Sequence, residues 1–118
     1  MGIFSVRVAL INPEHRDRRT EIDMLVDTGA TYMLLPPDVV RVLALEIVEY
    51  RPGELASGER VTYGVGPVIA RLDDREFPSV FVAGPEGCPA LLGAITLEAF
   101  GLAADPVHQV LFPVVARI

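Results

Sequence analysis

The sequence contains no lysine, one cysteine and two histidines, and these shortages exclude several kinds of site. Cys88 has no second cysteine to pair with, so no disulfide forms within the chain, which is compatible with a reducing compartment. His15 and His108 lie far from each other and from Cys88 in the sequence, without the spacing of zinc ligands. We therefore expect no metal, surface positions for both histidines, and a small inert apolar role for Cys88.

Long apolar runs are also missing, and positive charge is scarce. No segment approaches the roughly 20 apolar residues of a membrane-spanning helix, and residues 1–7 lack the charged start and apolar core of a secretion signal. The net charge of −6 argues against a nucleic-acid surface. Arginines cluster in segment 12–19, but Glu14 and Asp17 lie among them, which favours a solvated turn over a phosphate-binding patch. We expect a cytoplasmic protein without membrane or nucleic-acid partners and without a cofactor.

What the sequence does contain is typical of one globular, mainly β domain covering residues 1–118. Hydrophobic residues make up 51% of the chain, and most lie in short runs, several of which alternate with polar residues as in half-buried strands. We predict strands at 4–10, 20–26, 32–35, 46–50, 61–65, 68–72, 79–83, 90–93 and 107–115. Two short helices are expected, one at 36–45 that is apolar nearly all round and should be buried, and one at 96–100. Together these elements indicate a closed or nearly closed all-β fold.

One strand is followed directly by an acidic turn. The apolar residues Met24, Leu25 and Val26 lead into Asp27-Thr28-Gly29-Ala30. Taken alone, this motif favours a tight turn in which Asp27 accepts a hydrogen bond from its own backbone. Burying a lone carboxylate is costly in free energy, so the side chain of Asp27 must be paired, capped or used in chemistry.

Two further features follow the acidic turn along the chain. Residues 51–60 are rich in turn formers and lie between two β patterns, which indicates a hairpin. About sixty residues after Asp27, the apolar run Ala90-Leu91-Leu92 ends in Gly93 and a short helical pattern follows. Each feature alone has an ordinary structural interpretation.

In this order and spacing, the three features resemble the retropepsin-like aspartic peptidases, which comprise the retroviral proteases and their cellular relatives. That family is marked by two apolar residues before Asp-Thr-Gly-Ala, then a flap hairpin, then two apolar residues and a glycine before a helix. The resemblance covers the chain from about Ile3 to Phe112. It implies a closed acid-protease β-barrel with two short helices and one domain per subunit, and an aspartic endopeptidase that hydrolyses peptide bonds.

Aspartic peptidases use two carboxylates that share one proton, and this chain supplies one Asp-Thr-Gly. The other acids considered lack the apolar lead-in and the following glycine; they are Asp23, Asp38, Asp73 and Asp105. The pair therefore requires a homodimer in which Asp27 of each copy meets on a two-fold axis, as the resemblance also implies. A water between the two carboxylates would then attack the peptide bond.

The resemblance also implies roles for the neighbouring residues. Thr28 would donate a hydrogen bond across the two-fold axis, and Gly29 would let its backbone approach the carboxylates. Ala30 stands where pepsin-like enzymes carry a hydroxyl, which predicts activity nearer neutral pH than that of pepsin. Two further groups of residues would support the site. The flap that covers an extended peptide substrate would comprise Ala56, Ser57 and Gly58. The layer that packs beneath the catalytic turn would comprise Leu91, Leu92 and Gly93.

Other functions receive less support or stay open. A serine hydrolase is disfavoured because the chain has no Gly-x-Ser-x-Gly motif. The segment from Val107 onward is expected to contribute to the dimer interface, as its family equivalent does. The alternative to an enzyme is a non-catalytic dimerisation or peptide-binding module that keeps the fold but closes its cleft.

Overall fold

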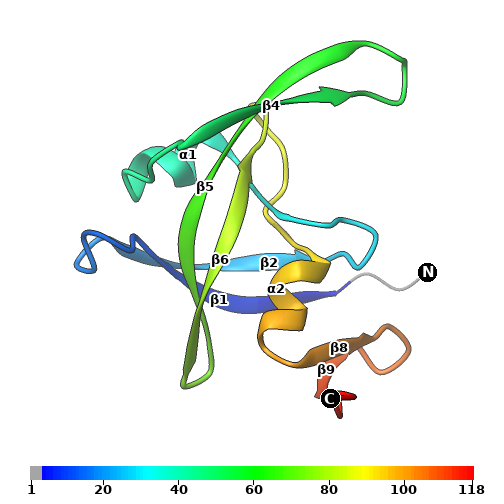
Figure 1. Cartoon of the computed structure of the whole chain (residues 1–118). Coiled ribbons are helices and arrows are strands. Elements are labelled where there is room, and N and C mark those ends of the chain that lie inside the picture. Colours follow the sequence, from blue (N-terminus) through cyan, green and yellow to red (C-terminus); the bar gives the residue numbers. More distant parts are fainter. Residues whose placement is uncertain (1–3) are drawn as a thin grey trace.

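The computed structural model describes residues 4–118, and the expected start of the resemblance at Ile3 lies outside them. The chain is mainly β, with two short helices (Figure 1). The strands are β1 (Ser5–Ile11), β2 (Arg19–Val26), β3 (Met33–Leu35), β4 (Glu49–Glu54), β5 (Arg60–Leu72), β6 (Arg75–Ala83), β7 (Leu91–Leu92), β8 (Leu102–Asp105) and β9 (Val110–Pro113). The helices are α1 (Pro37–Val42) and α2 (Ala94–Ala99).

Six of the strands form a closed ring. The main sheet has the order β1-β2-β7-β3-β6-β5-β4, and β1 also pairs with β5 through Leu10↔Ala70, which closes the sheet on itself. The ring surrounds a core of apolar side chains that includes Val8, Leu10, Met24, Met33, Leu35, Val68, Phe81 and Leu92, all without exposed surface. Closure removes most free strand edges. The predicted closed, mainly β fold is confirmed.

Three strands, β4, β8 and β9, lie outside this ring. Strand β4 pairs with the first half of β5 and forms a long hairpin that projects from the barrel (Figure 1). Strands β8 and β9 form a separate two-stranded sheet. Leu102, Ala104 and Leu111 of that sheet are partly buried and pack against the core.

The first helix differs from the prediction. Helix α1 ends at Val42, and none of its residues is fully buried. Val42 is 64% exposed, whereas Leu43 and Leu45, which follow the helix, are buried in the core. The expectation of an all-round buried helix was wrong because a six-residue helix on the barrel's outside contacts the core through one side alone.

The strands before and after residue 60 also differ from the prediction. The pattern at 46–50 starts its strand only at Glu49, and the strand continues through Pro52 and Gly53 to Glu54. The runs at 61–65 and 68–72 belong to one continuous strand, β5, despite Pro67. Along one edge of β5, β4 pairs as far as Val65 and β1 begins at Ile69. Pro67 lies in the interval between these two partners, where a missing N–H breaks no ladder.

The predicted last strand at 107–115 is shorter than expected, and a strand before it was missed. Asp105 ends β8, and its carboxylate accepts hydrogen bonds from the backbone N–H groups of Val107 and His108. These bonds turn the chain back into β9, which begins at Val110.

Within the part of the chain that the structure describes, no helix has the length and apolar character needed to span a membrane.

Candidate functional site

The Asp27 side chain is carried at the end of β2, where the strand leaves the barrel wall. Met24 and Val26 point into the core, and the chain then turns at Asp27. Asp27 is half-buried, whereas Thr28 and Gly29 are exposed in the single chain. The local sequence explains the turn, because Asp and Gly favour it and the apolar lead-in anchors the strand.

The run from Ala90 to Leu92 lies directly beside this turn. Strand β7 pairs in parallel with the end of β2, with Leu25 opposite Leu91 and Val26 opposite Leu92. The backbone N–H of Asp27 donates to the carbonyl oxygen of Leu92 at 3.1 Å. Leu92 has no exposed surface. The structure thus brings together two motifs that are about sixty residues apart in the sequence.

Gly93 lies beneath the loop that follows Asp27. A Cβ at this position would lie 2.8 Å from the Ala30 carbonyl oxygen and 2.5 Å from that of Tyr32. The next two backbone N–H groups, of Ala94 and Ile95, donate to the carbonyl oxygens of Ala30 and Thr31 at 2.8 and 3.0 Å. The start of α2 therefore holds the Asp27 loop from below, and only glycine leaves room for that contact.

The two oxygens of the Asp27 carboxylate have different surroundings. Oδ1 accepts a hydrogen bond from the Gly29 N–H at 2.9 Å, which is the turn predicted from the motif alone. Among residues 4–118, Oδ2 accepts no hydrogen bond. The loop thus fixes the direction of the carboxylate while leaving one oxygen able to accept or donate a proton.

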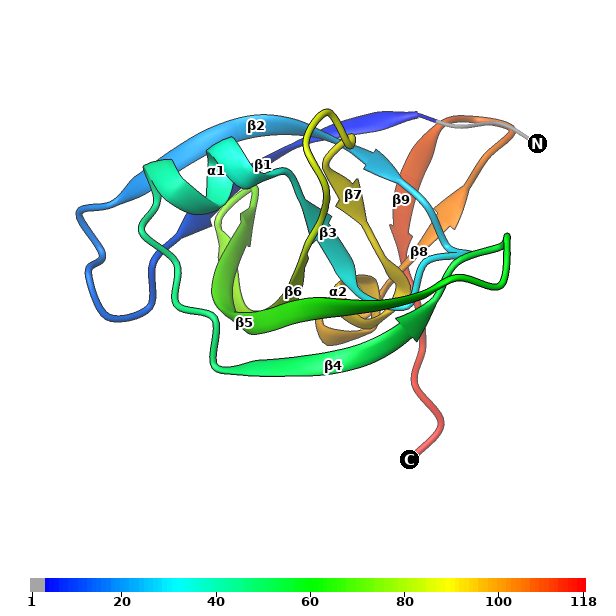
Figure 2. The same ribbon diagram turned by 90° about the horizontal axis from the view of Figure 1, so that it is seen from above.

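The hairpin β4–β5 lies at the same end of the molecule as the Asp27 loop. In Figures 1 and 2, the hairpin tip and the segment that follows β2 appear on the same side in both views. The hairpin turns through segment 55–59, closed by a hydrogen bond from the Leu55 N–H to the Glu59 carbonyl oxygen at 2.9 Å. Ala56, Ser57 and Gly58 form its exposed tip, and Gly58 has a φ of 90°, which favours glycine.

Arg51 and Tyr32 form a contact that the sequence reasoning missed. The Arg51 guanidinium on β4 lies 5.9 Å from the centre of the Tyr32 ring, and its Nη1 donates to the Tyr32 hydroxyl at 3.4 Å. The Arg51 Nε also donates to Glu49 Oε1 at 2.7 Å. Hydrogen bonds to Glu49 and then to Tyr32 raise the pKa of Arg51, so the guanidinium stays charged. The hairpin register was the missing signal, because it decides which face of β4 carries Arg51.

The residues considered for other chemistry lie elsewhere. In the described range 4–118, no group of three or more histidine, cysteine or acidic side chains is arranged to hold a metal ion. His15 and His108 are exposed as predicted, and His108 Nδ1 lies 2.7 Å from Asp105 Oδ2. Cys88 is half-buried, and desolvation, followed by the charge of Asp38, raises the pKa of its thiol. Cys88 therefore stays protonated and weakly nucleophilic at neutral pH.

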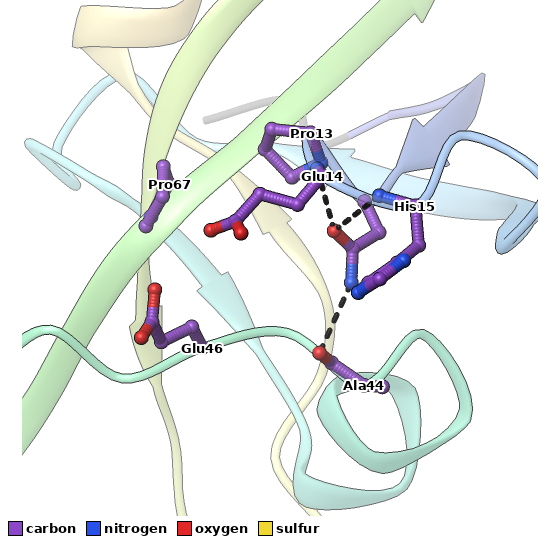
Figure 3. A pocket seen from close by; sticks show the side chains of 7 residues that line it. Pro13, Glu14, His15, Ala44, Glu46 and Pro67 are labelled. Atoms are coloured by element: carbon purple, nitrogen blue, oxygen red, sulfur yellow. Dashed lines mark hydrogen bonds between the residues drawn. The ribbon is translucent and has the colours of Figure 1, made fainter.

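A small cavity of about 220 Å³ lies at the loop that joins β1 to β2, at the opposite end of β2 from Asp27 (Figure 3). Buried Asn12 lines it and donates its amide hydrogens to the carbonyl oxygens of Leu43 and Ala44. Glu14 and Glu46 also line the cavity. The eight residues of β2 separate this loop from Asp27 by roughly 26 Å. The cavity is therefore distant from the Asp27 loop, and its buried amide serves to fasten the β1–β2 loop to the end of α1.

Comparisons with known proteins agree on the fold. No protein-family model matches the chain, and no curated protein sequence matches it significantly. Among solved structures, EIAV protease in complex with the inhibitor HBY-793 superposes with a TM-score of 0.60 at 19% identity, over 82% of this chain and 86% of that one. A retropepsin-like aspartic protease from Rickettsia conorii gives a TM-score of 0.56 at 22% identity, over 87% and 84% of the two chains.

The retroviral protease-like domain of Ddi1 from Leishmania major gives a TM-score of 0.59 at 13% identity, over 93% of this chain and 88% of that one. These three proteins come from very different sources and are dissimilar to this chain in sequence. The architecture that they share with this chain covers 82% to 93% of its residues. The chain therefore has the retropepsin-like fold.

Proposed function

We propose that the chain is an aspartic endopeptidase that acts as a homodimer, with Asp27 of each subunit contributing to one active site. The observation that carries this proposal is the Asp27 loop itself. Leu92 and Gly93 support it from beneath, Gly29 orients one carboxylate oxygen, and the other oxygen is left for a reaction partner. A turn that served structure alone would need the bond from Gly29, whereas here a segment about sixty residues away also holds the loop through its backbone.

The proposed reaction needs two such carboxylates about 3 Å apart, one ionised and one protonated. The ionised Asp27 takes a proton from a water as that water attacks the carbonyl carbon of the peptide bond. The protonated Asp27 of the second subunit donates a hydrogen bond to the carbonyl oxygen and stabilises the charge that develops there. A proton then passes to the leaving nitrogen, the C–N bond breaks, and the pair again holds one proton.

Support for a dimer comes from the C-terminal hairpin. Val110, Phe112 and Val114 alternate along β9 and just beyond it, and they are 49%, 43% and 49% exposed in the single chain. Leu111, between them, turns inward and packs against the core. The outer face of β9 is thus a stripe of exposed apolar side chains, which we assign to the contact with the second subunit.

The projecting hairpin supports a peptide as substrate. Alternate residues of β4 and β5 share one face, and on that face Arg51, Val61 and Tyr63 are half-buried. The contact between Arg51 and Tyr32 turns this face toward the Asp27 loop. An extended peptide held between the hairpin tip and the loop would offer its backbone to Ala56, Ser57 and Gly58 and its apolar side chains to this face.

The proposal is tested by the cleavage of a diverse peptide library between about pH 4 and pH 7 by the wild type and by Asp27→Asn. The substitution keeps the size of the side chain and removes the carboxylate. The matched control is Asp38→Asn, an exposed acid at the start of α1. We expect cleavage by the wild type and by Asp38→Asn, and none by Asp27→Asn. Equal cleavage by the wild type and both variants, or by none of the three, would contradict the proposal, and complete inactivity would favour the non-catalytic binding module.

A further inference from the structure

We propose that Arg51 and Tyr32 are positioning residues whose contact ties the β4–β5 hairpin to the loop that follows Asp27 and sets the hairpin's place over a bound peptide. The inference rests on the proposed endopeptidase function. It adds two residues to the site that the Asp-Thr-Gly motif does not include.

Tyr32 provides the fixed side of the contact. It lies five positions after Asp27, in the loop whose carbonyl oxygens face Gly93 and the start of α2. Its own carbonyl oxygen would lie 2.5 Å from a Cβ at position 93, so the backbone at Tyr32 rests closely on Gly93. Strand β3 begins at the next residue and fixes the loop's other end in the barrel. The Tyr32 ring therefore extends from the same rigid support that holds Asp27.

Arg51 provides the movable side. Strand β4 is the last strand in the order of the main sheet and pairs with β5 alone. Arg51 lies opposite Tyr63 and is half-buried, whereas its neighbours Tyr50 and Pro52 are exposed. The bond to Glu49 at 2.7 Å orients the guanidinium over the Tyr32 ring. Arg51 thus connects the hairpin to the Asp27 loop by a path that does not run through β5.

The strength of this contact suits a part that must move. A cation over an aromatic ring at a partly exposed site is a weak interaction, and a hydrogen bond of 3.4 Å adds little to it. A peptide can therefore displace the hairpin as it enters, and the contact re-forms when the hairpin closes. Loss of the contact should weaken peptide binding by about three- to fivefold without changing the chemical step.

The chain offers variants that separate the two halves of the contact. Arg51→Gln removes the charge, Tyr32→Leu removes the ring and the hydroxyl, and Tyr32→Phe removes the hydroxyl alone. Arg51→Lys keeps a cation near the ring and should restore part of the loss. The matched control is Arg60→Gln, because Arg60 lies in the same hairpin but is exposed and pairs with Glu54 at 3.7 Å.

The experiment measures peptide cleavage and backbone ¹⁵N relaxation of the hairpin tip, segment 55–59, in each variant of the full chain. We expect Arg51→Gln and Tyr32→Leu to raise KM about three- to fivefold at unchanged kcat. We also expect them to lower the order parameters of the tip, while Arg60→Gln changes neither quantity. A merely structural role would instead lower the amount of folded enzyme and leave KM as it is.

Two results would overturn the inference. The first is an unchanged KM together with unchanged order parameters in Arg51→Gln and Tyr32→Leu. The second is an equal change in Arg60→Gln, which would show that any loss of charge from the hairpin has this effect. If the wild type cleaves no peptide, the proposed function fails, but the relaxation data still show whether the contact restrains the hairpin.

Discussion

Gly93 and Tyr32 approach each other so closely that a Cβ on Gly93 would lie 2.5 Å from the Tyr32 carbonyl oxygen. The backbone of Gly93 is extended, with a φ of −93°, so glycine is required here for space and not for an unusual conformation. The loop above carries Asp27, and the start of α2 below donates hydrogen bonds to it. The Asp27 loop can therefore take this position only because residue 93 is a glycine and has no Cβ.

Replacing Gly93 by alanine should therefore destabilise the protein. The new methyl group meets backbone carbonyl oxygens that cannot rotate away, so we expect a loss of about 2–3 kcal/mol in the free energy of unfolding. Gly101→Ala is a useful comparison, because Gly101 has a φ of 68° but open space around it. That substitution should cost about 1 kcal/mol from conformation alone. Urea denaturation compares the two, and a Gly93→Ala loss no larger than that of Gly101→Ala would contradict the account.

Phe112 on the outer face of β9 should contribute to dimerisation. A charge in the stripe it forms with Val110 and Val114 would bury an unpaired carboxylate in the proposed dimer contact. We expect Phe112→Asp to raise the dimer dissociation constant by about tenfold or more. Val42→Asp is the control, because Val42 is 64% exposed on α1 and lies outside this stripe. Sedimentation at several concentrations measures both, and equal dissociation constants for Phe112→Asp and the wild type would count against this interface.

Ala30 offers a test of pH dependence. If two Asp27 carboxylates form the proposed pair, a hydroxyl beside the Asp27 turn would donate a hydrogen bond to the ionised form of that pair and favour that form. We therefore expect Ala30→Ser to move the acidic limb of the pH–rate profile to lower pH, and the wild type to act nearer neutral pH than pepsin does. The measurement is kcat/KM from pH 2 to pH 8. A wild-type optimum below about pH 3 would show that this explanation of Ala30 is wrong.

Glu76 should make stability depend on pH. Hydrogen bonds from Arg16, which is the larger cause, and from Arg71 lower the pKa of Glu76 below its ordinary value of 4.5. Because the folded-state pKa is the lower one, this stabilisation is complete above pH 4.5 and disappears as the pH falls through the lowered value. We expect Glu76→Gln to be less stable than the wild type at pH 7 and equally stable at low pH.

Urea denaturation from pH 2 to pH 7 checks this expectation. Glu98→Gln provides the control, because Glu98 is an exposed acid on α2. A difference between Glu76→Gln and the wild type that stays constant over the whole pH range would show that the ion pairs of Glu76 are not its cause.

The parts of the site that are local in sequence could be predicted from the sequence. The turn at Asp27 follows from an apolar run, an aspartate that bonds its own backbone and a glycine, all within a few residues. The place of Gly93 could be expected only through the family pattern, because its reason is a contact with Ala30 and Tyr32 more than sixty residues away. The contact of Arg51 with Tyr32 depends on the hairpin register, which the sequence leaves open.

The errors in the fold have similar causes. The strands predicted at 61–65 and 68–72 form one strand because Pro67 occupies the interval between β4 and β1 on one edge of β5, which only the complete topology reveals. Strand β8 was missed because Ala103, Ala104 and Asp105 have low β propensity. The packing of Leu102 and Ala104 against the core overrides that propensity.

The most direct test of a shared active site is to mix the wild type with Asp27→Asn in equal amounts, allow the subunits to exchange, and measure peptide cleavage at constant total protein. If each site needs Asp27 from both subunits, only dimers of two wild-type copies act. Activity should then fall to about one quarter of the pure wild type. A mixture with Asp38→Asn in place of Asp27→Asn should keep full activity. A fall to about one half would mean that each Asp27 acts alone, and it would contradict the account.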